Sequence, residues 1–398
     1  MIRKSIEITL AALMLLSHVA CASTTVRSTT VTPVVQGDPN ISEQELLDVG
    51  IELFNPGLDE IDEDDITAFP EVRLAEARFV PYQLMDTMQA SANWGAVRIV
   101  PKDTSAVDVE VAGDIRHSDG ESMKLRVRVV DATGRQWFER EYEAQASEFS
   151  YQEGRNHQLD PFQDIYNRIS NDIARHRQQL TAEDIREIRN VAQMKFAEKF
   201  SPEAFGGYLE TDKNGIYSVK RLPAENDPMM ERIYKIRERD YLYVDTLQDY
   251  YGSFVREMDE PYQDWRQTSY EEVLAYRELR STSRKHAVAG AIAMLGGILA
   301  AGSNSGTARA AGGAAMVGGG YLIKSAMDKS AESAIHAEGL RELGASMSAE
   351  VGPQIIELED RTVTLTGTAQ DQYEQWRVIL RDIYASEVGE ISVSDIDS

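Results

Sequence analysis

Few side chains in this chain of 398 residues have types and spacings that could carry chemistry. The acidic run of residues 59–65 offers oxygen ligands for Ca²⁺, but it lacks the glycine and the terminal glutamate of an EF-hand loop, which favours a solvated loop. No two of the six histidines have the spacing of metal ligands. They are His18, His117, His157, His176, His286 and His336. The sequence also lacks a Walker loop, an HExxH helix and a Gly-x-Ser-x-Gly elbow, so we expect no enzyme activity, no metal and no cofactor.

The exception is Cys21, the only cysteine, whose thiol cannot form a disulfide within the chain. The residues before it have the pattern of a signal peptide over residues 1–20, with Arg3 and Lys4 followed by an apolar run, residues 8–16, and then small residues. This run is too short to cross a bilayer, which takes roughly 20 apolar residues. We therefore expect cleavage and export.

The segment 16–21 resembles the lipobox of bacterial lipoproteins, in which the cysteine thiol takes a diacylglycerol. Ala20 fits that pattern, whereas His18 stands where leucine is usual. The resemblance implies acylation of Cys21, and Ala22 in place of Asp implies the outer membrane, facing the periplasm. The alternative is an ordinary signal peptide with an incidental cysteine. Two acyl chains would form a firm membrane anchor.

The charge of the chain bounds its partners. The formal net charge is -25 at pH 7, so nucleic acid and anionic lipid surfaces are poor partners. The expected partners are the membrane, through the lipid, and either an envelope protein or further copies of the chain. Residues 21–44, rich in Ser, Thr and Val, are expected to form a tether from the lipid.

Residues 45–180 alternate between strand and helix patterns and predict a small α/β domain. Strands are expected at residues 49–54 and 94–100, and three more, starting at residue 108, should form an antiparallel meander with one wet face. A helix over residues 74–88 should begin or kink at Pro81, and a helix over residues 162–173 should close the domain.

This order resembles the small domain at the start of the Tol-system propeller protein and in curli-secretion-like lipoproteins. The similar parts are the first strand, residues 50–56, the strand and turn of residues 113–120, and residues 129–134 before an aromatic strand. In those envelope proteins the domain serves docking and assembly, so the resemblance implies a binding module. The whole chain is also similar to uncharacterised lipoproteins of Gram-negative bacteria.

Residues 181–282 are expected to be helical and rich in tyrosine. Thr181 and Asp184 have the spacing of a capping box, and Pro261 should separate a last helix from those before it. The tyrosines favour a helix-packing core, and the alternative is a stacking surface for sugar or protein. They are Tyr234, Tyr241, Tyr243, Tyr250, Tyr251, Tyr262, Tyr270 and Tyr276.

Residues 283–329 are unusually rich in glycine and alanine and predict a helical hairpin. Small residues recur at helical spacing and would let two helix backbones approach closely. The residues that we single out for a membrane or oligomer contact are Gly290, Gly296, Gly297, Ala311, Ala315, Gly318 and Gly319. The arms are shorter than the roughly 20 residues of a straight span, so a membrane hairpin, a tightly packed soluble hairpin and a flexible linker all stay open.

Residues 330–398 are expected to hold a polar helix and then a small β-hairpin and helix. Residues 362–368 before that helix are similar to part of the BON-type domains of envelope proteins. The predicted class is thus α+β. The predicted function is a non-enzymatic, lipid-anchored periplasmic adaptor or assembly factor of the cell envelope, and the alternative is a membrane-inserting or channel-forming oligomer built on the Gly-rich hairpin.

Overall fold

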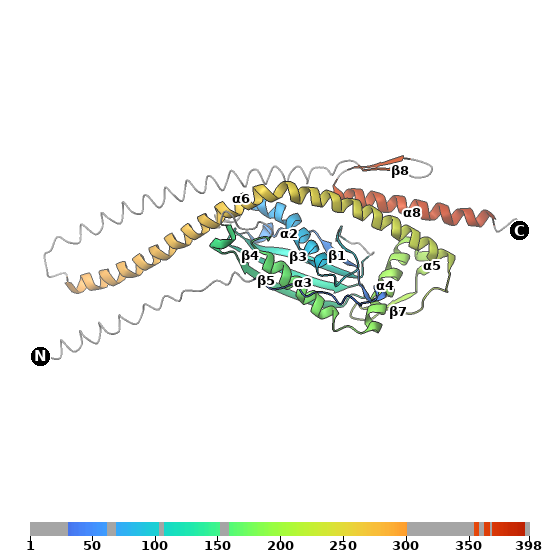
Figure 1. The fold of residues 1–398 in the computed structure, drawn as a ribbon, viewed down its shortest axis with the longest axis horizontal. Coiled ribbons are helices and arrows are strands. Elements are labelled where there is room, and N and C mark those ends of the chain that lie inside the picture. Colours follow the sequence, from blue (N-terminus) through green and yellow to red (C-terminus); the bar gives the residue numbers. More distant parts are fainter. Residues whose placement is uncertain are drawn as a thin grey trace. The chain divides into compact units, whose positions relative to one another are not determined.

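A computed structural model describes residues 31–61, 69–102, 107–151, 159–300, 354–357, 362–366 and 368–394. It confirms the α+β class, with helices around a mixed sheet (Figure 1). The five strands of this sheet lie in the order β2-β1-β3-β4-β5. They are β1 (Val49–Glu52), β2 (Val97–Val100), β3 (Val109–Ser118), β4 (Ser122–Asp131) and β5 (Gln136–Gln145). Strand β1 pairs in parallel with β2 and β3, whereas β3, β4 and β5 form an antiparallel meander.

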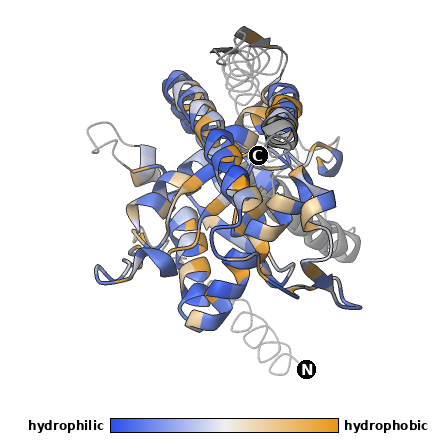
Figure 2. Cartoon of the chain, turned by 90° about the vertical axis from the view of Figure 1, so that its right-hand side faces the viewer, coloured by the Kyte–Doolittle hydropathy of each residue, from blue (hydrophilic) through white to orange (hydrophobic). Residues whose placement is uncertain are grey.

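One face of the sheet is covered by two helices, α2 (Pro70–Ala90) and α3 (Gln163–Arg177) (Figure 1). The alternating burial along β3 and β4 follows from the period of two in a strand, because every second side chain faces these helices. The helix ribbons carry both hydrophobic and hydrophilic residues (Figure 2).

The two edges of the sheet are protected differently. At the β2 edge, the Gln248 side chain donates to the Ile99 carbonyl at 2.8 Å and accepts from the Ile99 N–H at 2.9 Å, as a neighbouring strand would. The β5 edge exposes Glu139, Arg140 and Glu141. Both arrangements disfavour pairing with a foreign strand.

Helix α2 begins at Pro70, so of the two alternatives for Pro81 a helix start is wrong, and a kink stays a prediction. Pro81 lies inside the helix, where it has no N–H to donate to the Ala77 carbonyl. The Phe54 N–H donates to that carbonyl instead, at 3.0 Å. The chain after β1 thus fills the hydrogen bond that the proline leaves open.

The expectation that Pro261 separates two helices is also wrong. Helix α6 (Pro228–Ala300) continues through Pro261. Residues on both sides of the proline, Met258, Tyr262 and Trp265, are buried in a cluster with Phe79 and other residues of α2. This packing offsets the cost of an internal proline, about 3 kcal/mol.

Residues 181–227 contain elements that complete this end of the molecule. Helix α4 (Ala182–Phe200) begins with the predicted capping box, because Thr181 accepts from the Asp184 N–H and Asp184 accepts from the Thr181 N–H. A short helix, α5 (Pro202–Phe205), precedes a β-hairpin that the sequence had not predicted. Its strands are β6 (Leu209–Thr211) and β7 (Tyr217–Val219).

The C-terminal hairpin and helix are present as β8 (Gln354–Glu357), β9 (Thr362–Leu365) and α8 (Ala369–Ser394). Helix α8 packs on α6 through rings, with Trp376 and Tyr243 stacked at 5.4 Å between centroids. The buried Tyr373 hydroxyl donates to Asp240 across the same contact at 3.2 Å.

Part of the segment expected to be a tether is fixed to the domain. The N–H groups of Thr32 and Val35 donate to Asp164 and Asn171 of α3, and Gly37 N–H donates to the Ser91 carbonyl. This part of the chain therefore lies against α3 and the end of α2. The signal peptide and Cys21 lie outside the described residues, as do residues 301–353 with most of the expected hairpin.

Candidate functional site

A cleft of about 740 Å³ lies at the end of the sheet where strands β1 and β3 begin. Three structural units line it: the residues that precede these strands, helix α4 and helix α6. Its size is within the range of small-molecule and cofactor sites, about 300–1,000 Å³. The residues that line it are tyrosines, amides and charged residues of both signs.

Two of the acidic residues in the lining are aspartates, one before each strand. Asp48 precedes β1 and Asp108 precedes β3, so the parallel pairing of these strands brings them together. The Asp108 carboxylate accepts from the Asp48 N–H at 2.9 Å, and the Asp48 carboxylate accepts from the Ala96 N–H at 2.8 Å. Asp108 is only 2% exposed, whereas Asp48 is half-buried.

Helix α4 supplies a wall of hydrogen-bond donors. Arg186, Arg189, Asn190 and Gln193 recur at intervals of three and four residues, so they lie on one face of the helix and line the cleft. Arg189 also donates to the carbonyls of Glu43 and Gln44, at 3.2 and 2.9 Å, which joins α4 to the segment before β1.

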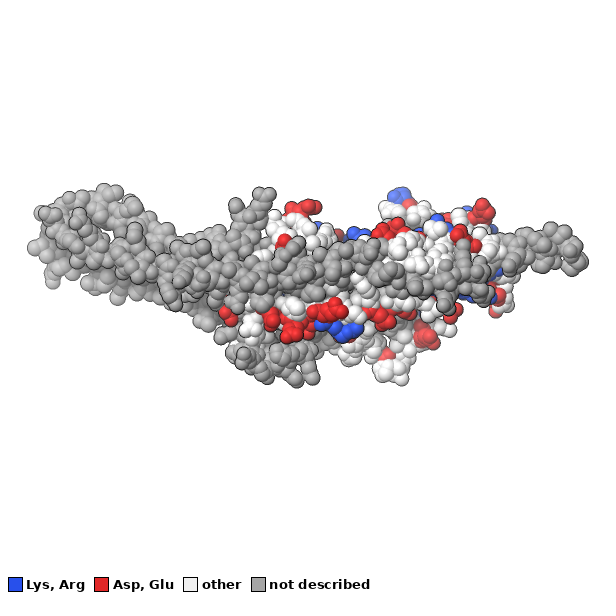
Figure 3. All heavy atoms as spheres, turned by 90° about the horizontal axis from the view of Figure 1, so that it is seen from above, with Lys and Arg blue, Asp and Glu red and all other residues white. Residues whose placement is uncertain are grey.

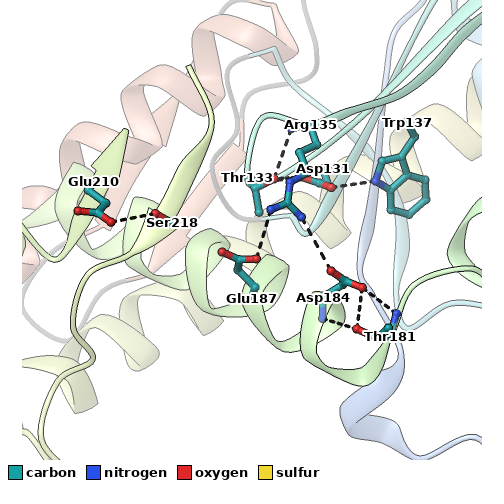
Figure 4. Close-up of polar contacts among 9 residues, drawn as sticks. All are labelled: Asp131, Thr133, Arg135, Trp137, Thr181, Asp184, Glu187, Glu210 and Ser218. Atoms are coloured by element: carbon teal, nitrogen blue, oxygen red, sulfur yellow. Dashed lines mark hydrogen bonds and ion pairs between the residues drawn. The ribbon is translucent and has the colours of Figure 1, made fainter. Parts of the chain in front are cut away.

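The turn between β4 and β5 helps to hold α4 in place (Figure 4). Arg135 in this turn lies 3.5 Å from Glu187 and 4.0 Å from Asp184, both in the first turns of α4. Asp131 accepts from the Trp137 indole N–H at 2.9 Å and from the Thr133 N–H, which fixes the shape of the turn. The turn therefore helps to position α4 and the hydrogen-bond donors that this helix presents to the cleft.

The same turn is hydrogen-bonded to Asp108 and to the hairpin of β6 and β7. The Ala132 N–H donates to the Asp108 carbonyl, and the Tyr217 N–H of β7 donates to the Thr133 carbonyl, both at 2.8 Å. Gly134 has φ +89°, a conformation in which L side chains are strained. Lys195 of α4 lies over the Tyr217 ring at 3.8 Å and joins the hairpin to α4.

Helix α6 supplies the third side through Tyr234, Arg237, Glu238 and Tyr241, which again share one helical face. The Arg237 Nε donates to the Tyr241 hydroxyl at 3.0 Å, and its guanidinium lies over the Tyr241 ring. Arg98 of β2 covers the same ring, with its guanidinium carbon 4.7 Å from the centroid. Tyr234 is 50% exposed and offers a reachable position beside the cleft.

Burial changes the acid–base properties of two cleft residues. It raises the pKa of Asp108 to about 6, although the hydrogen bond from Asp48 and the charges of Arg237 and Arg189 act in the opposite direction. Burial also raises the pKa of Tyr241 to about 12, so its hydroxyl stays protonated at neutral pH. Of these two residues, Asp108 is the one whose pKa lies closer to neutral pH.

The arrangement suits binding by opposite charges on different sides of one cleft. Guanidinium groups can hold a carboxylate through paired hydrogen bonds, and the aspartates can hold an ammonium. In the part of the chain that the structure describes, no three or more His, Cys, Asp or Glu side chains come together as a metal site. No helix among the described residues has the length and hydropathy of a membrane span.

The residues singled out from the sequence do not form this cleft. Gly290, Gly296 and Gly297 lie within the last turns of α6, while Cys21, Ala311, Ala315, Gly318 and Gly319 lie outside the described residues. Most of the described tyrosines are core residues, as the favoured interpretation held: Tyr243, Tyr251, Tyr262 and Tyr270 are buried.

Sequence reasoning missed the charged residues of the cleft, in particular Asp48, Asp108, Arg189 and Arg237. One available signal was the polar face of α4 at helical spacing, which on its own indicates only a solvated helix. Comparison of the chain with protein-family models and with curated proteins finds no match.

Proposed function

We propose that the protein is a non-enzymatic adaptor or assembly factor of the bacterial cell envelope. It is held by lipid on Cys21 to the periplasmic face of the outer membrane and binds a partner through the cleft between α4, α6 and the start of β1 and β3. The observation that carries the proposal is the cleft itself, in which guanidinium and carboxylate groups from three units line one space. The signal-peptide pattern and the lipobox-like segment before Cys21 support the location.

The cleft also contrasts with the rest of a strongly acidic molecule. On the face shown in Figure 3, acidic side chains gather over the described surface and basic ones lie between them. In the cleft, Arg186, Arg189 and Arg237 come together from two helices. With Asp48, Asp108 and Glu238 they give the cleft as many basic as acidic side chains, whereas the whole chain has a formal net charge of -25.

A photo-crosslinking amino acid placed at Tyr234 tests the binding role in intact cells. We expect a discrete cross-linked band in the envelope fraction, which disappears when Arg186 and Arg189 are both changed to Met. The matched control places the same group at Phe149, which is 61% exposed and does not line the cleft. Equal bands from both positions, or none from Tyr234, would contradict binding through the cleft.

The second candidate is an oligomer built on the Gly-rich hairpin, and the length of α6 favours it. This helix runs without interruption to Ala300 and so carries Gly290, Gly296 and Gly297 in helical conformation. The second arm of the proposed hairpin, with Ala311, Ala315, Gly318 and Gly319, would pack against the first through small residues.

Fractionation separates the two candidates. Wild type, Cys21→Ser and a deletion of residues 287–327 are expressed with labelled palmitate and extracted with high salt or with detergent. Under the adaptor proposal, lipid is the sole anchor of the wild-type protein. We therefore expect Cys21→Ser to lose the label and become extractable without detergent. If this variant stays in the membrane until residues 287–327 are also removed, the hairpin is an insertion element and the oligomer replaces the adaptor.

A further inference from the structure

The cleft has aspartates at the start of β1 and β3 and arginines on α4, while α6 adds one charge of each sign through Arg237 and Glu238, and this distribution restricts what it can bind. The acidic residues, Asp48 and Asp108, are fixed by the parallel pairing of β1 with β3 and by backbone N–H donors. The basic residues Arg186 and Arg189 stand one turn apart on α4. A simple anion would meet the aspartates, and a simple cation would meet the guanidiniums.

From this geometry we infer that the cleft binds a short peptide with a free ammonium and a free carboxylate. The carboxylate lies against Arg186 and Arg189, and the ammonium lies against Asp108 and Asp48. The inference rests on the proposed function and names the ligand class of the same site. A phosphate-type anion is not the preferred ligand, because it carries no ammonium for the side of the cleft that Asp48 and Asp108 form.

Three further features of the lining fit a peptide. The volume, about 740 Å³, exceeds the need of a single amino acid and suits a ligand of a few residues. Asn190 and Gln193 stand beside the arginines on α4, and among the described residues neither has a side-chain hydrogen bond. Their amides can both donate to and accept from a peptide backbone.

The positions of Arg189 and Asp108 are supported independently of any ligand. Arg189 is held by two backbone carbonyls of the segment before β1, and α4 is held by Arg135 through Glu187. Asp108 is held by the N–H of Asp48. Groups fixed in this way lose little freedom on binding, which favours affinity.

Three forms of one peptide test the inference on the full-length chain purified in detergent. They are trialanine with free ends, its N-acetylated form and its C-terminal amide, each titrated by calorimetry. We expect saturable binding of the free form, and capping either end should weaken binding by about tenfold or more. Equal binding of the three forms, absence of saturable binding at millimolar concentration, or full displacement by inorganic phosphate would each overturn the inference.

Variants assign each end of the peptide to its side of the cleft. Arg186→Met with Arg189→Met should abolish the preference for the free acid over the amide, and Asp108→Asn should abolish the preference for the free amine over its acetylated form. Asparagine keeps an oxygen that can accept from the Asp48 N–H, so the fold should persist. The control is Arg175→Met on α3, an exposed arginine that does not line the cleft and should leave all three affinities unchanged.

The outcomes also separate this inference from the adaptor proposal. If Tyr234 still cross-links to a protein in cells while no trialanine form binds, the adaptor proposal stands and the ligand class is wrong. If the free peptide binds with the expected preferences while Tyr234 gives no cross-linked band, the cleft is a peptide site and the adaptor proposal fails.

Discussion

At the residue scale, buried polar side chains join the helices to the sheet. The Tyr262 hydroxyl of α6 donates to Glu76 of α2 at 2.5 Å and accepts from the Arg266 guanidinium at 2.8 Å. Arg266 in turn pairs with Asp160 at 2.6 Å. All four side chains lie in the interior, where an unpaired polar group costs more than on the surface.

Tyr262→Phe tests how much this hydrogen-bond network contributes to the free energy of unfolding. The ring can keep its contacts with Phe79 and Trp265, but Glu76 and Arg266 each lose a partner. We expect the free energy of unfolding to fall by about 1–3 kcal/mol, measured from the urea midpoint. Tyr234→Phe, at a half-exposed position, should change it by less than about 0.5 kcal/mol. Equal effects of the two variants would show that the buried network adds nothing specific.

Asp108 gives the stability a defined pH dependence. Its pKa is about 6 in the folded chain because burial disfavours the charged form, against an ordinary value of 3.8. The groups that face it are Asp48, which raises the pKa, and Arg237 and Arg189, which lower it. Between these two pKa values the folded chain keeps a proton that the unfolded chain has released. Stability from this group is therefore greatest below pH 3.8 and is lost as the pH rises to about 6.

The expected result for Asp108→Asn follows from that sign. We compare the free energy of unfolding of the variant with that of wild type. This difference should favour the variant more at about pH 7 than at about pH 4, by on the order of 2 kcal/mol. Urea unfolding at both pH values measures the difference. Asp240→Asn should act in the same direction, because burial raises the pKa of Asp240 to about 6 as well. A difference that does not depend on pH would mean that Asp108 keeps its ordinary pKa.

At the scale of elements, the docking of α8 on α6 combines stacked rings with polar groups that lack partners. Tyr243 stacks on both Tyr373 and Trp376, at 6.3 and 5.4 Å between centroids. Yet the Asp240 Oδ1, the Tyr243 hydroxyl and the Trp376 indole N–H are buried without a hydrogen-bond partner among the described atoms. Such groups reduce the net gain from burying the rings. The contact should therefore be weaker than its aromatic area suggests.

Trp376→Ala should release α8 without unfolding the sheet. Removing a buried tryptophan costs about 3–5 kcal/mol, which is enough to free a helix whose contact is already weakened by unpaired groups. Hydrogen exchange should then accelerate in residues 369–394 while β3 and β4 stay protected. The control Val378→Ala, on the exposed side of the same helix, should leave the exchange unchanged. Loss of protection throughout the sheet would show that α8 is an integral part of the core.

At the scale of the whole molecule, the sheet and the helical region share one hydrophobic core. A single cluster of buried residues contains side chains of the sheet, of α2, α3 and α4, and of α6 and α8. Residues 45–180 and residues 181–282 therefore contribute to the same interior. The cleft lies where these two regions meet, since its aspartates come from the first and its arginines from the second.

A shared core predicts cooperative unfolding of these regions. Circular dichroism, which follows the helices, and tryptophan fluorescence, with Trp94 and Trp137 near the sheet and Trp265 on α6, should give coincident urea transitions. Separate transitions for the two probes would contradict the shared core. Trp376→Ala is a useful background for this test, because it removes the one tryptophan on α8.

The sequence determined the local elements because their causes are local. Alternation with a period of two predicted the strands of the meander, and the spacing of Thr181 and Asp184 predicted the capping box of α4. It failed at Pro261 and left the start of α2 open at Pro81, because the compensation for a proline comes from distant residues, namely α2 for Pro261 and Phe54 for Pro81. The same reason hid the cleft. Asp48, Asp108, Arg189 and Arg237 are far apart in the chain, and only the parallel pairing of β1 with β3 and the packing of α4 and α6 over that end of the sheet bring their charges together.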